Sequence, residues 1–383
     1  MSRRVVIITE IIAPYRIPVF NALARLQDID LHVIFLAEND PTQRQWLVYR
    51  DEIHFSYEVL PSWRKRVGKH CVLLNWGVQG ALHRASPDFI VCGGYNYAAS
   101  WKAMAWARQH QVPFFLWVES TTRDSRNRHP IIESMKIKFL RGCDGFVAAG
   151  KASREYLRTY GIRESSIFTA PNAVDTELFK REAELVRGNE TLHRKDLHLP
   201  ARFFLFAGRL IHEKGIFDLL QAYGSLGADL REQVGLVFVG DGPARAALQD
   251  LAAAICPGSI HFAGFAQRQQ LAAYYALADA LVFPTHSDTW GLVVNEAMAC
   301  GLPVIASDVA GCVVDLIEDN WNGRVVVAQQ SRQFASAMEE LARNAPLRTR
   351  MSERCGQRIK QYSPEAWAAG LAGAVFSSLR QVA

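Results

Sequence analysis

Two cations in the second half of the sequence are the first candidates for chemistry. Arg209 and Lys214 stand five residues apart, directly after an apolar stretch that ends at Gly208. A guanidinium can bind two phosphate oxygens at once, and an ammonium adds a point charge. Together these side chains could hold a diphosphate, although solvated loop charges would give the same pattern.

A second group of candidates follows the apolar stretch 280–284. Asp288 precedes Gly291, where the pattern predicts the start of a helix, and Glu296 lies inside that helix. The free amides of Gly291 and Leu292 would form an anion site at the helix start. Glu296 sits among apolar residues, so we expect it to need a hydroxyl or cationic partner. A capping Asp and an exposed helical Glu remain the alternative.

Two further apolar stretches end in glycine-containing turns. Gly240, Asp241, Gly242 and Pro243 follow one of them, and Gly264 with Phe265 follows another. Glycine allows a close backbone approach, and proline suits the first turn of a helix. Taken alone, each is a weak signal.

These residues need elements that bring them together, and the sequence alternates short apolar stretches with helix-length segments. This alternation predicts parallel sheets with helices on both faces. Ligands bind at the carboxyl ends of strands in such sheets, so the candidates should share one edge. The expected strands are 4–9, 31–36, 53–59 (an edge strand), 89–92, 113–118, 145–149, 202–208, 235–240, 260–264, 280–284, 303–307 and 324–327, and one expected helix spans 72–85.

Two doubly wound α/β domains in tandem follow from this pattern. We assign residues 1–175 to the first domain, the polar and charged segment 176–200 to a linker, and 201–358 to the second domain. The apolar tail within 359–383 predicts a helix that packs between or across the domains, or else an ordinary terminal helix.

Composition excludes several classes. Hydrophobic residues make up 49% and charged residues 21%, which is typical of a globular protein and not of a disordered chain. The sequence has no apolar run long enough to cross a membrane, and its first apolar run is too short for a signal peptide. The seven cysteines form no CxxC pair, which argues against a zinc site or disulfide framework and favours the cytoplasm.

Positive charge is concentrated in the first 175 residues, which contain 23 Lys or Arg and 16 Asp or Glu. The segment 63–69 mixes four basic residues with Trp63. An anionic membrane surface, on the inner face of the plasma membrane, is one expected partner. A solvated loop is the alternative, and nucleic acid is not expected because no recognition module is present.

Taken in order, these motifs resemble those of the retaining GT-B glycosyltransferases of glycosyltransferase family four. The resemblance covers residues 202–327 and rests on Gly-Arg-Leu-x3-Lys-Gly, Val-Gly-Asp-Gly-Pro, Phe-x-Gly and an acidic residue that is separated by seven residues from Glu-Ala-Met-Ala. Pro171-Asn172-Ala173-Val174-Asp175 is similar to the family's linker motif. The resemblance implies two Rossmann-like domains facing across a cleft, with the last helix crossing back to the first domain.

The resemblance also implies residue roles on the donor side. Arg209 and Lys214 would hold the donor diphosphate, Glu296 the ribose hydroxyls and Asp288 the transferred sugar. Gly291 and Leu292 would bind the sugar or the phosphate, and Gly264 and Phe265 would contact the nucleobase. Gly208 is also assigned to donor binding. Asp288 departs from the family pattern because it replaces a glutamate and is one methylene shorter.

The acceptor side is less defined. Glu119 follows the strand 113–118 and is the first choice for holding or polarising the acceptor. Further candidates are Tyr15, Arg16, Tyr95, Asn96 and Asn172.

The resulting hypothesis is a retaining transfer of a sugar from a UDP- or GDP-sugar to a glycan or polyprenyl-linked acceptor, in cell-envelope or exopolysaccharide synthesis. No metal or other cofactor is expected, because two cations and a helix start would neutralise the diphosphate. The alternatives are a GT-B-fold nucleotide-sugar epimerase and a catalytically weak nucleotide-sugar-binding subunit.

Overall fold

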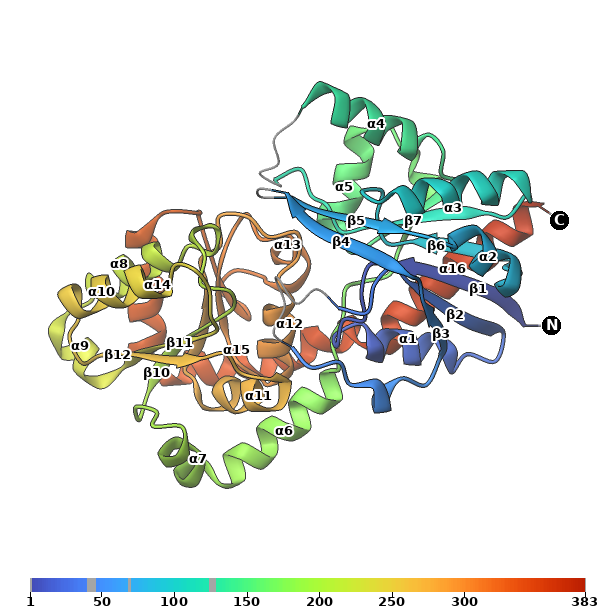
Figure 1. The fold of residues 1–383 in the computed structure, drawn as a ribbon. Coiled ribbons are helices and arrows are strands. Elements are labelled where there is room, and N and C mark those ends of the chain that lie inside the picture. The colour runs from blue at the N-terminus through green and yellow to red at the C-terminus, as the bar shows by residue number, and fades with distance from the viewer. Residues whose placement is uncertain (1, 40–45, 68–69, 124–128, 383) are drawn as a thin grey trace. The chain divides into compact units, whose positions relative to one another are not determined.

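The computed structural model describes residues 2–39, 46–67, 70–123 and 129–382, and the chain forms two compact units (Figure 1). Unit 1 contains Met1–Ala173 and Pro364–Ala383, and unit 2 contains Val174–Ser363. Each unit is built around one parallel sheet, so the prediction of two α/β sheets is confirmed.

The sheet of unit 1 has the strand order β3-β2-β1-β6-β7-β8-β9. The chain runs outward from β1 to one edge and then restarts at β6 on the other side of β1. The strands are β1 (Arg3–Thr9), β2 (Ile29–Phe35), β3 (Ser56–Val59), β6 (Phe89–Cys92), β7 (Phe114–Val118), β8 (Gly145–Ala148) and β9 (Ile167–Thr169). β3 is the expected edge strand and pairs in parallel with β2.

Alternate residues of β1 point into the two cores of unit 1. Val6 and Ile8 face one core, which is covered by α2 (Val78–Ala85), α3 (Ala98–Gln109), α4 (Pro130–Leu140) and α5 (Lys151–Thr159). Val5 and Ile7 face the other core, beneath α1 (Ile17–Ala24) and α16 (Pro364–Val382). Strands buried on both faces are apolar throughout, as parallel sheets require.

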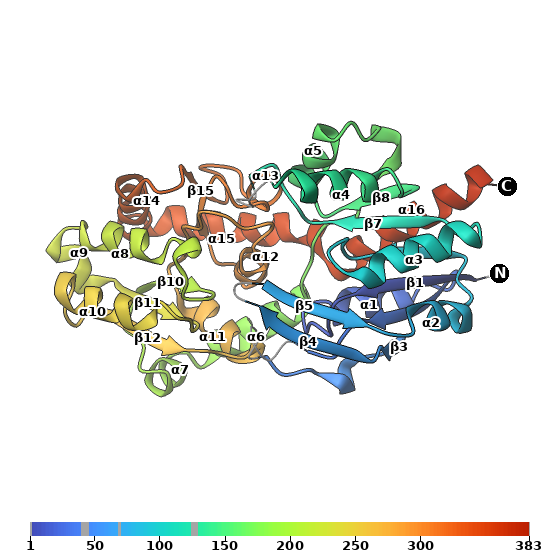
Figure 2. The same cartoon turned by 45° about the horizontal axis from the view of Figure 1, so that its top comes forward.

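The last helix, α16, packs on α1 although the two are far apart in sequence (Figure 2). Trp367 is buried, with ring centroids 5.7 Å from Phe20 and 5.1 Å from Trp117. Gly370 lies so close to β9 that a Cβ atom would be 2.2 Å from the Thr169 carbonyl oxygen. Residues 359–363, which we had grouped with this tail, belong to unit 2.

The sheet of unit 2 has the order β12-β11-β10-β13-β14-β15. Successive strands are added on one side of β10 up to β12, and β13 then starts the other side of β10. The strands are β10 (Phe203–Ala207), β11 (Gly235–Val239), β12 (Ile260–Gly264), β13 (Ala280–Phe283), β14 (Val304–Ser307) and β15 (Gly323–Val326). The helices are α8 (Ile216–Gly224), α9 (Ala228–Gln233), α10 (Arg245–Ile255), α11 (Arg268–Leu277), α12 (Leu292–Ala299), α13 (Val313–Leu316), α14 (Ser331–Arg343) and α15 (Ala345–Ile359).

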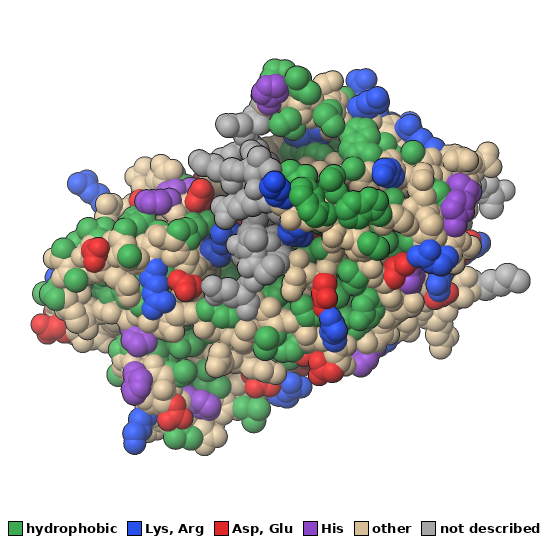
Figure 3. Space-filling view, viewed as in Figure 1, with side chains coloured by type: hydrophobic (Ala, Val, Ile, Leu, Met, Phe, Trp, Pro, Cys, Tyr) green, Lys and Arg blue, Asp and Glu red, His purple; other side chains and the backbone are tan. Residues whose placement is uncertain are grey.

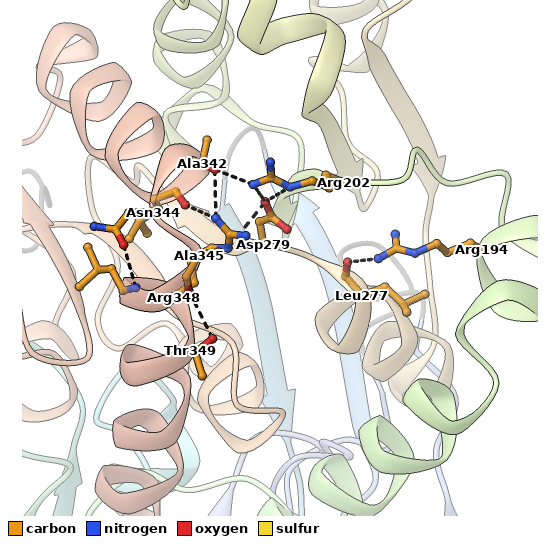
Figure 4. Close-up of polar contacts among 11 residues, drawn as sticks. Arg194, Arg202, Leu277, Asp279, Ala342, Asn344, Ala345, Arg348 and Thr349 are labelled. Carbon is orange, nitrogen blue, oxygen red and sulfur yellow. Dashed lines mark hydrogen bonds and ion pairs between the residues drawn. The ribbon is translucent and has the colours of Figure 1, made fainter.

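Ion pairs close the amino-terminal edge of this second sheet. The Arg202 guanidinium donates to the Asp279 carboxylate at 2.9 Å and to the Ala342 carbonyl at 2.7 Å. Arg348 approaches the same carboxylate from α15 (Figure 4). Arg202 and Asp279 directly precede β10 and β13, so this group lies at the sheet edge opposite to the carboxyl ends of the strands. We therefore assign these ion pairs a role in stabilising the fold and not in binding a ligand.

The segment 176–200, which the sequence assigns to a linker, is helical in the structure. It forms α6 (Thr176–Gly188) and α7 (Glu190–Asp196) within unit 2. Asp175 caps α6 by accepting a hydrogen bond from the Leu178 amide at 3.0 Å. Phe179, Ala183 and Val186 form an apolar stripe that is buried, and α6 packs against α11 and α12. The polar composition concealed this stripe.

The expected helix 72–85 is also partly wrong. Its first residues belong to β5 (His70–Asn75), which pairs antiparallel with β4 (Ser62–Val67). The basic segment 63–69, for which a solvated loop is the alternative interpretation, therefore lies largely in a hairpin, and Gly68 and Lys69 fall outside the described residues. Leu73 is buried while its neighbours are exposed, which is the period-two pattern of a strand.

Candidate active site

The loop after β10 is held against the end of β13. Gly215 has a φ of +66°, and a Cβ atom there would lie 2.0 Å from the Pro284 carbonyl oxygen. The His286 amide donates to the Glu213 carbonyl at 2.9 Å. Backbone contacts between two strand ends therefore fix the position of Lys214.

Lys214 and Asp288 form an ion pair between these two loops. The lysine ammonium also lies 5.8 Å from the centroid of the Phe283 ring, and the Asp288 Oδ1 atom accepts from the Trp290 amide at 3.2 Å. Both side chains are about four-fifths buried. The structure thus brings together two predicted site residues of opposite charge.

Arg209 belongs to the same loop but is exposed. It forms no ion pair with any residue that the structure describes. The neighbouring Leu210 amide donates to the Asp241 carbonyl at 2.9 Å, and the Gly208 amide donates to the Val239 carbonyl at 3.0 Å. The backbone around Arg209 is therefore anchored while its guanidinium is free to meet an anion.

Gly291 sets the start of α12. Its φ is +96°, and a Cβ atom there would lie 2.7 Å from the Phe283 ring. The loop before it is tied down by hydrogen bonds from the Gly311 and Cys312 amides to the Asp288 and Trp290 carbonyls, at 3.0 and 3.1 Å. A helix start held in this way can direct the amides of Gly291 and Leu292 at an anion.

Glu296 lies one turn into α12 and has the hydroxyl partner that its surroundings required. The Tyr275 hydroxyl of α11 donates to its Oε2 atom at 2.8 Å. Burial raises the pKa of Glu296 to about 7, although the Tyr275 hydrogen bond and the positive charge of Arg268 oppose the shift. This carboxyl group therefore titrates near neutral pH.

The glycine-rich turns pack backbone on backbone. A Cβ atom on Gly240 would lie 1.9 Å from the Gly208 carbonyl oxygen, and one on Gly242 would lie 2.4 Å from that of Leu210. The Gly240 amide donates to the Gly264 carbonyl at 2.7 Å. The end of β12 is thereby joined to the ends of β11 and β10, and the Phe265 side chain beyond it is 42% exposed.

Sequence reasoning missed several polar groups at this edge. His286 forms an ion-pair contact with Asp218 of α8, and the Thr285 hydroxyl lies 2.9 Å from the Ser287 carbonyl oxygen. Tyr275 was missed as the partner of Glu296. The polar run after Pro284 was the available signal for Thr285 and His286, whereas Tyr275 lies inside an ordinary helix and gave none.

Three of the acceptor-side candidates form a network in unit 1. The Glu119 Oε1 atom accepts from Arg16 at 3.0 Å and from Asn172 at 2.8 Å. The Arg16 guanidinium stacks 3.8 Å from the centroid of the Trp117 ring and 5.6 Å from that of Tyr15. The residues follow β1, β7 and β9, so this network lies at the carboxyl edge of the first sheet.

Tyr95 and Asn96 do not join this network. Tyr95 packs 6.0 Å from the Phe139 ring, its carbonyl accepts from Trp101 at 3.1 Å, and Asn96 is exposed. Within the described residues, neither forms a hydrogen bond or ion pair with Glu119. Tyr95 instead faces α4.

Among the residues that the structure describes, no three His, Cys, Asp or Glu side chains are grouped so that they could hold a metal ion. None of the described helices combines the length and apolar character that crossing a membrane requires.

Two family models match this chain, one in each half. "Glycosyltransferase Family 4" matches residues 19–178, and "Glycosyl transferases group 1" matches residues 189–358. Each half of the chain is therefore similar to one of these glycosyltransferase families.

Curated relatives match over part of their length. A D-inositol 3-phosphate glycosyltransferase of Thermomonospora curvata is 32% identical over 54% of this chain and 50% of the relative. A GDP-mannose-dependent alpha-mannosyltransferase of Corynebacterium glutamicum is 28% identical over 75% of this chain and 64% of the relative. The chain thus spans about half the length of the first of these relatives.

Solved structures share the whole fold at low sequence identity. HepE of Anabaena in complex with UDP has a TM-score of 0.77 and 17% identity, covering 98% of this chain and 100% of that chain. Sucrose-phosphate synthase of Thermosynechococcus elongatus has a TM-score of 0.76 and 19% identity, covering 99% of both chains. These likenesses confirm the predicted GT-B fold class.

Proposed function

We propose that this protein is a retaining glycosyltransferase that moves a sugar from a nucleotide-diphosphate sugar to a glycan or lipid-linked acceptor. The two family matches support the reaction class, and a relative named as a GDP-mannose-dependent mannosyltransferase supports the donor class. The observation that carries the proposal is the ion pair of Lys214 and Asp288 beside Arg209 and the start of α12.

Donor chemistry would take place at the carboxyl edge of the second sheet. When the bond between sugar and diphosphate breaks, negative charge accumulates on the diphosphate. Lys214, Arg209 and the first amides of α12 would stabilise that charge, which lowers the barrier because they are already in position. A bound metal is not needed for this neutralisation.

The two acidic residues would have separate roles. Asp288 already contacts Lys214 and would accept hydrogen bonds from hydroxyls of the transferred sugar. Glu296 is half-buried and would accept from the ribose hydroxyls of the nucleotide. Gly264 and Phe265 would contact the base.

On the acceptor side we assign Glu119 to binding the incoming hydroxyl group. Arg16 and Asn172 would orient its carboxylate, because both donate to one oxygen of that group. An acceptor and a donor held on separate units would allow the acceptor to vary without changing the donor site.

A panel of UDP-, GDP- and ADP-sugars tests the donor assignment by thermal shift and by release of the nucleoside diphosphate. We expect one nucleotide to raise the melting temperature and to lose that effect in Arg209→Ala and Lys214→Ala. NMR of the product would show the same anomeric configuration as the donor. No response to any donor, or an inverted product, would contradict the proposal.

A catalytically weak binding protein is the second candidate, since Asp288 is shorter than the family glutamate and already pairs with Lys214. In that case the donor would bind without turnover, and Asp288→Glu would restore it. An epimerase would instead convert the donor sugar without any acceptor. Analysis of the sugar after incubation with donor alone separates these outcomes.

A further inference from the structure

The β4–β5 hairpin has one face packed on unit 1 and one face exposed. On the packed face, Leu73 is buried and Arg64 donates to Glu10 at 3.3 Å. The strand register pairs Trp63 with Leu74 and Lys65 with Val72, so these four side chains share the other face. Trp63 is 47% exposed, and Trp76, just beyond β5, is 55% exposed. Burial of these rings would remove a large apolar area from contact with water, which is energetically favourable.

Helix α4 buries Phe139 and Leu140 at its end, whereas its earlier turns keep a lysine inward and leave apolar residues exposed. The Lys136 ammonium contacts Glu133 at 2.6 Å and the Tyr160 hydroxyl of α5 at 3.1 Å, and the Lys136 side chain is only 11% exposed. The same turns expose Ile131, Ile132 and Met135, whose side chains are 65%, 55% and 52% exposed. A surface helix normally buries its apolar side, so this orientation indicates that something else covers it.

Apolar side chains gather over both elements on one face of unit 1 (Figure 3). The exposed lysines Lys65 and Lys138 accompany them. Residues 60–77 contain four Lys or Arg and no Asp or Glu, and residues 120–142 contain six Lys or Arg and two Asp or Glu. We call Trp63, Lys65, Leu74, Trp76, Ile131, Ile132, Met135 and Lys138 the apolar–basic surface.

We propose that the apolar–basic surface docks unit 1 onto a lipid bilayer with anionic headgroups. Tryptophan favours the boundary between headgroups and hydrocarbon, and amphipathic elements lie in that boundary with their apolar side inserted. Lysines close to the same plane are attracted by anionic lipid. A second copy of the chain fits less well, because a symmetric contact would bring lysines together without acidic partners.

Flotation of the full chain with phosphatidylcholine vesicles, with or without phosphatidylglycerol, tests this surface without any donor or acceptor. We expect binding to the vesicles with phosphatidylglycerol and weaker binding at high salt. Lys65→Gln and Lys138→Gln should each lower the partition coefficient roughly five-fold. Trp76→Ser combined with Ile132→Ser should lower it on the order of ten-fold or more.

Matched controls lie on unit 2. Leu192 is 56% exposed, as Trp76 and Ile132 are, and Lys180 is an exposed lysine on α6. Leu192→Ser and Lys180→Gln should leave vesicle binding unchanged, and all variants should keep the parent melting temperature.

Three results would overturn the proposal. They are equal loss of binding in the controls, unchanged binding in the Trp76 and Ile132 double variant, and a concentration-dependent dimer that this double variant converts to a monomer. Because donor binding plays no part in the measurement, failure here would leave the proposed transfer reaction standing.

Discussion

Lys214 and Asp288 are separated by 74 positions in sequence, yet their side chains meet in the folded protein. Each alone resembles an ordinary surface charge. Paired and mostly buried, they form a site with one positive and one negative group at fixed separation, and the exposed Arg209 adds a second positive charge. We propose that the donor diphosphate binds at this group of charges.

Replacing either cation by alanine tests this residue-scale interpretation. Arg209→Ala and Lys214→Ala should each lower kcat by ~10²–10³, because each removes a group aimed at the developing charge. Lys180→Ala, on α6, is the matched control and should retain full turnover. Initial-rate kinetics with the donor found in the panel measure the effect, and wild-type rates in both site variants would reject the diphosphate assignment.

Glu296 predicts a distinct pH dependence of stability. Its pKa in the folded protein is about 7, above the ordinary value of 4.5, so the folded state holds a proton that the unfolded state has lost. The free energy of unfolding should therefore fall as the pH rises from about 4.5 to about 7 and level off above that range.

Urea unfolding across this pH range compares the wild type with Glu296→Gln. The variant cannot ionise at this position, so its stability should decline less between pH 4.5 and 7. Glu177→Gln, on the exposed side of α6, should follow the wild-type curve. Parallel curves for wild type and Glu296→Gln would show that this carboxyl group titrates normally.

At the scale of elements, strand ends and turns determine where the site residues lie. Gly215 touches the Pro284 carbonyl, Gly240 touches the Gly208 carbonyl, and Gly291 touches the Phe283 ring. These contacts lock three loops together at the carboxyl edge of the sheet. The charged groups can then be preorganised because the backbone beneath them cannot move independently.

Gly215→Ala should lower the free energy of unfolding more than Gly258→Ala does, although both substitutions introduce similar backbone strain. Gly258 also has a positive φ, +80°, but a Cβ atom there would meet nothing within 4 Å. We expect about 1–2 kcal/mol lost in Gly258→Ala from strain alone. Gly215→Ala should lose a further ~1–3 kcal/mol from the overlap with Pro284.

Chemical denaturation of the two alanine variants measures this difference. Gly215→Ala should also weaken donor binding, since Lys214 precedes it directly, whereas Gly258→Ala should bind donor normally. Equal stability losses in the two variants would mean that the loop relaxes away from β13.

At the scale of the whole molecule, the chain builds unit 1 from its two ends. Helix α16 supplies Trp367 to a core that otherwise comes from residues 1–173, beside Phe20 and Trp117. Unit 1 is therefore discontinuous in sequence, and its stability depends on a helix that follows unit 2 in the chain.

Trp367→Ala should destabilise unit 1 by about 3–5 kcal/mol, because it removes a large, fully buried ring. Trp76→Ala, which removes an exposed ring of the same unit, should change stability by no more than about 0.5 kcal/mol. Urea unfolding monitored by tryptophan fluorescence provides the comparison. Similar small losses in both variants would show that α16 contributes little to the core of unit 1.

The sequence alone determined the α/β class and most strands, because an apolar stretch of four to seven residues between turns is a local pattern. The motifs at the strand ends could be recognised in the sequence for the same reason, as the segments around Gly208 and Gly291 show. Glu119 and Arg16 could likewise be selected by their position after a strand.

Only the tertiary structure decided which of these residues meet. The pairing of Lys214 with Asp288, the Tyr275 hydroxyl on Glu296 and the separation of Tyr95 from Glu119 all depend on how distant elements pack. The helices at 176–200 and the β4–β5 hairpin were misread for a related reason. The residue types of both segments were visible in sequence, but burial of an apolar stripe or of one hairpin face requires a neighbour that local sequence does not specify.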